Sequence, residues 1–152
     1  MIDTTLRVVS DSGVNIATLD KSGIKDEVLG SFFNIYHTIT WPVIAAQANS
    51  FIHVCQSGIW QVAAVHEAHT VATSDAGGTV DVLVCPQAVA IASGVTQLTA
   101  PLALDGTAPE HQAGVLIAAP TLFRAGDCLA LAFAVGTTAL VGDITVTIKR
   151  VG

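Results

Sequence analysis

Two histidines and a glutamate stand within four residues at His66-Glu-Ala-His69, a group of side-chain types that can ligate metal ions. The spacing is not H-E-x-x-H, in which two histidines share one face of a helix. On a strand, His66 and His69 lie on opposite faces, so one ion cannot bind both without a bulge. His53 and Cys55 do share a strand face, but they need two further ligands. Structural or exposed histidines are therefore favoured, and we expect no metal site and no cofactor.

The other reactive residue types lack the spacing that catalysis requires. Serine, histidine and aspartate are present, but the nucleophile motif G-x-S-x-G is not. The turn Asp75-Ala-Gly-Gly78 is not followed by G-K-[ST], so it is not a phosphate loop. Glu67, Asp81 and Asp127 are the candidate acid–base carboxylates, but no pattern brings two of them together, and we expect them on solvated strand faces or in turns. We predict that the protein is not an enzyme.

Aromatic side chains offer a different chemistry. Trp41 and Trp60, with Tyr36, would form a stacking platform for a sugar ring if they were exposed beside polar groups. Packing in the core is the favoured role for both tryptophans.

Charge and composition exclude several classes of partner. The chain has 152 residues and a net charge of -6, and no lysine or arginine occurs between Asp26 and Phe123. Nucleic acid and anionic membrane surfaces, which need clustered cations, are therefore not expected as partners. Hydrophobic residues make up 51% of the sequence and charged residues only 12%. We expect other subunits to cover part of the surface.

Neither a membrane span nor a disulfide framework is expected. The longest apolar runs, such as 128–135, fall far short of the ~20 residues that a membrane helix needs, and the first residues do not resemble a signal peptide. The three cysteines, Cys55, Cys85 and Cys128, are widely spaced and odd in number. They are interpreted as reduced, buried thiols of a protein made in a reducing cytosol.

The clearest structural pattern lies in the last thirty residues. In 128–135, Leu129, Leu131, Phe133 and Val135 alternate with Cys128 and three alanines, and in 144–151, Ile144, Val146 and Ile148 alternate with polar residues. A period of two predicts half-buried strands, which we interpret as a hairpin.

Further strands are predicted along the rest of the chain. Residues 31–41 read as a main core strand that Pro42 ends, and 79–85 alternates cleanly. Residues 59–73 fit a helix or a strand, and the neighbouring strands favour the strand. The glycine-rich turn at 74–78 predicts a hairpin between 59–73 and 79–85. Shorter strands are expected at 51–56, 98–104 and 112–118.

These elements predict one all-β domain over residues 1–152. Eight to ten strands with turns about every ten residues are typical of an antiparallel β-sandwich or jelly roll. Residues 2–30 are less regular, with short strands at 6–9 and 14–17 and a single helical turn at 25–29. This segment is either edge strands and a loop of the domain or, in residues 1–30, an arm that reaches a neighbouring subunit.

From Trp60 onward, the order of features resembles a known group of proteins. The matching segments include Ala92-Ser-Gly-Val-Thr-Gln-Leu-Thr99, Leu102-Ala-Leu-Asp-Gly-Thr-Ala108, Ala125-Gly-Asp-Cys-Leu-Ala-Leu131 and Ile144-Thr-Val-Thr-Ile-Lys-Arg-Val151. Over residues 59–151 the sequence is similar to the jelly-roll cement, or decoration, proteins of tailed-bacteriophage heads.

The resemblance implies a homo-oligomeric jelly roll, a homodimer or homotrimer, made in the host cytoplasm and located on the outside of the virion. It would bind the major capsid protein and stabilise its lattice. Half of the basic residues, Arg7, Lys21 and Lys25, stand in the unmatched N-terminal third, and we predict that they contact acidic capsid surface. The alternative is a receptor- or carbohydrate-binding jelly roll of a phage tail, which would use Trp41, Tyr36 and Trp60.

Overall fold

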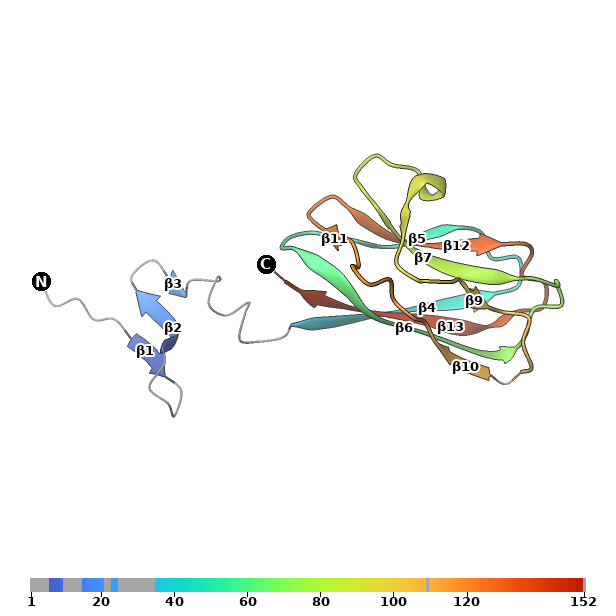
Figure 1. Cartoon of the computed structure of the whole chain (residues 1–152), viewed down its shortest axis with the longest axis horizontal. Coiled ribbons are helices and arrows are strands. Elements are labelled where there is room, and N and C mark those ends of the chain that lie inside the picture. Colours follow the sequence, from blue (N-terminus) through green and yellow to red (C-terminus); the bar gives the residue numbers. More distant parts are fainter. Residues whose placement is uncertain (1–5, 10–14, 21–22, 25–34, 109, 152) are drawn as a thin grey trace, which may run out of the picture.

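The computed structural model describes residues 6–9, 15–20, 23–24, 35–108 and 110–151. In this part of the chain the regular structure consists of strands and one short 3-10 turn, η1 (Ile91–Ser93). All strand pairs are antiparallel, and two five-stranded sheets face each other as a sandwich (Figure 1). The predicted all-β class is confirmed.

The first sheet has the strand order β10 (Glu110–Ala113), β6 (Trp60–Val71), β13 (Val141–Arg150), β4 (Tyr36–Ile44), and β11 (Leu122–Phe123) also pairs with β6. The second sheet has the order β5 (Ser50–Val54), β12 (Cys128–Ala134), β7 (Thr79–Cys85), β8 (Val95–Thr96), and β9 (Leu102–Ala103) also pairs with β7.

This order is that of a jelly roll. Along the chain, β4, β6, β10 and β13 fall in the first sheet, whereas β5, β7, β8 and β12 fall in the second. Sequence neighbours therefore cross repeatedly between the sheets, as in the double-sheet arrangement of eight strands. Both predicted hairpins are wrong, because β6 and β7 lie in different sheets and so do β12 and β13. The turns between them were located correctly, but each turn links the two layers of the sandwich.

The core lies between the sheets where alternation predicted it. Ile144, Val146 and Ile148 of β13 are buried and face Leu129 and Leu131 of β12 in one apolar cluster. The same cluster holds the three valines of β7, Val80, Val82 and Val84. Val135 departs from the predicted pattern: β12 ends at Ala134, and Val135 is exposed with a left-handed backbone, φ 64°.

Two strands differ from their predictions. β4 is an edge strand of the first sheet, and Pro42 lies inside it, where the missing N–H does not break a ladder on both sides. In β6 the register against β13 shifts, so that Val62 pairs with Ile148 and Ala64 with Thr147. The bulge at Ala63 allows Val62 and Val65 both to be buried. Simple alternation along this strand predicts that Trp60, Val62, Ala64 and His66 share one face, and the bulge shows that this prediction is wrong.

The outer faces of the two sheets are covered differently. On the second sheet, Leu83, Cys85 and Ala130 form a small buried cluster, against which Ile91 of η1 packs. The connection from β7 to β8 thus covers that face with side chains of the same chain. The first sheet has no comparable buried cluster on its outer face among the described residues.

The N-terminal region contains a small three-stranded sheet, β1 (Leu6–Val9), β2 (Asn15–Asp20) and β3 (Gly23–Ile24). Its register places Leu6 opposite Leu19, and Leu19 opposite Ile24. The predicted strands at 6–9 and 14–17 are confirmed, although the second extends to Asp20. The predicted helical turn at 25–29 lies outside the described residues.

Candidate functional site

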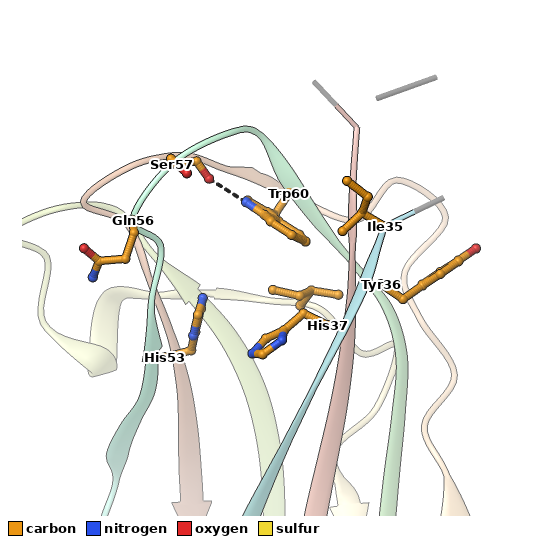
Figure 2. A pocket seen from close by; sticks show the side chains of 8 residues that line it. Ile35, Tyr36, His37, His53, Gln56, Ser57 and Trp60 are labelled. Carbon is orange, nitrogen blue, oxygen red and sulfur yellow. Dashed lines mark hydrogen bonds between the residues drawn. The ribbon is translucent and has the colours of Figure 1, made fainter. Parts of the chain in front are cut away.

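A pocket of about 280 Å³ lies where the edge strands of the two sheets approach each other, at the start of β4 and the end of β5 (Figure 2). We call it the edge pocket. In Figure 2 the rings of Trp60, His37 and His53 surround the hollow, and Tyr36 points away from it. Its lining residues are Ile35, Tyr36, His37, His53, Gln56, Ser57, Trp60 and Ile148.

The polar groups of the edge pocket are an indole N–H, an amide, a hydroxyl and two imidazole rings. The indole Nε1–H of Trp60 donates to the carbonyl of Ser57 at 2.6 Å, which fixes the ring across the pocket. The rings of His37 and His53 lie 5.7 Å apart between centroids, tilted by 44°. Burial lowers the pKa of His53, and positive charge on His37 lowers it further. His53 therefore stays neutral to a lower pH than an exposed histidine does.

The three aromatic residues proposed as a stacking platform occupy different positions in the structure. Trp60 lines the edge pocket, and Tyr36 stands at its margin with 55% of its surface exposed. Trp41 lies further along β4 and packs partly buried against the core, as does one side of Trp60. Both tryptophans thus pack against the core, and Trp60 also lines the edge pocket.

A second polar group is buried inside the sandwich, on β6 and β10. Glu67 and His69 are each only 1% exposed, and Glu67 Oε1 lies 2.8 Å from His69 Nδ1. Gln112 Nε2 donates to the other carboxylate oxygen of Glu67 at 3.2 Å and to the carbonyl of Ala103. His69 Nε2 has no hydrogen-bond partner among the described residues and lies 3.9 Å from Glu110 Oε2.

Burial is the main reason that the pKa of Glu67 is raised, and the hydrogen bond from His69 partly opposes it. Glu67 was expected on a solvated face, and that expectation is wrong. The alternation of β6 after its bulge turns Glu67 and His69 inward, beside Val65. Alternation counted from Val65 places Glu67 and His69 inward, whereas alternation counted from Val62 places them outward. Only the position of the bulge shows which count applies.

The remaining predicted residues are dispersed. His66 is turned away from His69 and stacks against His111 of β10, with ring centroids 5.4 Å apart. Asp81 is half-buried and accepts hydrogen bonds from Thr96 and the Val82 amide, whereas Asp127 accepts from the backbone amides of Arg124 and Gln87. Burial raises the pKa of Asp81. Cys55, Cys85 and Cys128 are free thiols.

Of the three residues predicted to contact the capsid, the structure describes only Arg7. Arg7 lies in β1, opposite Thr18 of β2. Lys21 and Lys25 lie outside the described residues.

Comparisons with known proteins do not identify a family. No protein-family model matches the sequence, and no curated protein is significantly similar to it. Within the described ranges, no group of three or more histidine, cysteine, aspartate or glutamate side chains has a geometry suited to a metal ion. The described residues also form no helix long and apolar enough to span a membrane.

Proposed function

We propose that this chain is a viral structural protein, a cement protein that binds the outside of a tailed-phage capsid as a homo-oligomer and stabilises the lattice of the major capsid protein. The observation that carries the proposal is the jelly roll itself, one of whose sheets has no buried cluster on its outer face among the residues that the structure describes. Jelly rolls of this kind recur in viral capsid proteins, although the fold alone does not define a function.

The sequence segments that resemble phage cement proteins fall on framework elements of this fold. Ile144–Val151 contains most of β13, the strand between β6 and β4, and Ala125–Leu131 forms the turn into β12 and its first half. The resemblance therefore concerns the strands that build the fold. Recognition of the capsid has to come from surface residues. A surface with few charges suits burial against a capsid lattice.

The test is co-sedimentation of the purified full-length chain with phage heads stripped of their accessory proteins. We expect saturable binding at a fixed ratio to the major capsid protein and a higher temperature of head disruption. Heads that bind none of the chain, or bind it without saturation, would overturn the proposal.

The edge pocket favours a second function, a carbohydrate-binding module of a phage tail. Trp60 supplies a flat aromatic wall, and Gln56, His37 and His53 supply planar hydrogen-bonding groups beside it. Aromatic faces next to polar planar side chains suit a sugar ring. The volume is near the lower limit for a ligand pocket, so the expected ligand is a single sugar unit.

A glycan array probed with the full-length chain tests this second function. Binding to defined glycans that Trp60→Ala abolishes and Trp41→Ala leaves unchanged would support it. An array with no hits, in the presence of saturable head binding, would leave the cement function alone.

A further inference from the structure

At its centre, the outer face of the first sheet carries small side chains and few ionisable ones. Thr40 of β4 pairs with Thr145 of β13, and Thr38 pairs with Thr147. The hydroxyls of these pairs lie 3.5 Å and 3.3 Å apart. In β6, His66 continues the first row and Ala64 the second. We call this surface, made of outward residues 36–44 of β4, 141–149 of β13 and 64–70 of β6, the threonine face.

The two ends of the threonine face differ in charge. Lys149 stands beside Tyr36 at one end, and Asp143 stands between Pro42 and Ala68 at the other. Lys149 and Asp143 project from the same face of β13, because their positions differ by an even number of residues. Neither has an ion-pair partner among the described residues of its own chain.

The two ends also differ in shape. Tyr36 is 55% exposed and points outward from the edge pocket, so it projects from the threonine face (Figure 2). At the opposite end is a hollow of about 450 Å³, whose lining includes Pro42, Ile44 and Asp143. One end of the face is thus a cationic projection, and the other is a hollow with an anionic wall.

A two-fold rotation makes these ends complementary. Consider two copies whose threonine faces are stacked on each other. The two-fold axis lies between the two sheets and runs perpendicular to the strands, at the level of Val146. Because the axis reverses strand direction, position 149 of each copy lies over position 143 of the other, and position 36 lies over position 42. Lys149 then meets Asp143 twice, and Tyr36 twice enters the hollow. The small threonines at the centre allow the sheets to approach to the usual ~10 Å.

The size of the face is sufficient for such a contact. With strands about 4.8 Å apart and a rise of about 3.3 Å per residue, three to four strands over nine residues present roughly 500 Å² per copy. Two copies then bury roughly 1,000 Å², the lower limit for a specific interface. The expected dimer is therefore one that dissociates on dilution.

We infer that the threonine face is a self-association surface, which pairs two copies of this chain through reciprocal contacts of Lys149 with Asp143 and of Tyr36 with the hollow. The inference rests on the self-association that the proposed function includes, and it requires no capsid. Its occupant is a second copy of the chain, because projection and hollow, cation and anion, are present together on one surface.

Sedimentation velocity of the full-length chain, over a concentration series in low salt and without phage heads, tests the inference. The wild type is expected to dimerise. Asp143→Lys and Lys149→Asp are each expected to weaken dimerisation about ten-fold or more, because each places two pairs of like charges in contact. An equimolar mixture of the two variants is expected to restore the dimer, since every contact in the mixed pair is again between opposite charges.

Arg124→Asp, a reversal at an exposed residue outside the ranges that form the threonine face, is the matched control and should leave dimerisation at the wild-type level. Circular dichroism checks that each variant is folded. A monomeric wild type, a reversal that leaves dimerisation unchanged, or a mixture that stays monomeric would each overturn the inference. Because head binding is measured separately, loss of the dimer and loss of the cement function are distinguishable.

Discussion

Glu67 is the residue whose chemistry conflicts most with its surroundings. Its carboxylate is buried between the sheets and is held by His69 and Gln112, but it lies close enough to Glu110 for that charge to raise its pKa further. A buried carboxylate lowers stability when it is ionised unless its partners compensate fully for the lost water. The dependence of stability on pH should therefore report on this residue.

We predict that Glu67→Gln removes part of that dependence. The pKa of Glu67 is raised in the folded protein above its ordinary value of 4.5, so above that pH the folded state binds more protons than the unfolded state. Wild-type stability should therefore fall as pH rises from 4.5 through the folded pKa. In urea unfolding at a series of pH values, the variant should lose less stability over this window, although the slope due to Asp81 remains. Equal slopes would contradict the prediction.

Val135 carries backbone strain at an exposed position. It is 62% exposed, and its φ of 64° is unfavourable for a β-branched side chain. Val135→Gly should therefore stabilise the protein by roughly 0.5–1 kcal/mol, the left-handed penalty less the entropy cost of glycine. Ala139→Gly, at the same φ, is the control and should gain less. Chemical denaturation that shows a loss of stability in Val135→Gly would refute this account.

At the scale of the element, alternation predicted strands and inward residues well. The inward residues of β7 and β13, such as Val82 and Val146, were correctly predicted because one face of each strand packs in the core. The pairing of strands was not predictable in the same way. A glycine-rich turn such as 74–78 fits a hairpin and a crossover between sheets equally well, because the local turn chemistry is the same.

The sites show the same limit. His37 and His53 meet only because β4 and β5 are the adjacent edges of two sheets, and no spacing in the sequence encodes that meeting. Trp60 was identified from its residue type. Glu67 was identified as a candidate acid, but the bulge at Ala63 reversed its predicted exposure.

The bulge itself leads to a prediction about β6. Deleting Ala63 restores simple alternation, with Val62 and Val65 still inward, so the variant should fold cooperatively with reduced stability. Deleting Ala132 from β12, whose pairing with β7 is regular, turns Phe133 and the residues beyond it to the other face. That deletion should abolish cooperative unfolding. Thermal unfolding followed by circular dichroism compares the stabilities of the two variants. Equal losses of stability would show that the bulge does not tolerate a deletion better than a regular strand position does.

At the scale of the whole molecule, basic residues are so few that their positions suggest where an acidic partner would bind. Arg7, Lys21 and Lys25 are half of the basic residues, and all three stand in the N-terminal third of the sequence. We predict that reversing all three to glutamate weakens binding to stripped heads, and more so at low ionic strength, because acidic capsid surface would then repel them. Arg124→Glu should bind as the wild type does. Undiminished co-sedimentation of the triple variant would refute the contact.

The strand order also constrains how the molecule comes into being. β13 lies between β6 and β4, and β12 lies between β7 and β5, yet both follow all of these partners in the sequence. While the chain is being synthesised, the earlier strands of each sheet lack their central neighbour and expose apolar edges. Neither sheet can be completed until its central strand, β12 or β13, has left the ribosome. We therefore expect the sandwich to form only after β13 has been synthesised and to fold slowly, on the order of milliseconds to seconds, with a period of susceptibility to aggregation that makes chaperones useful during expression.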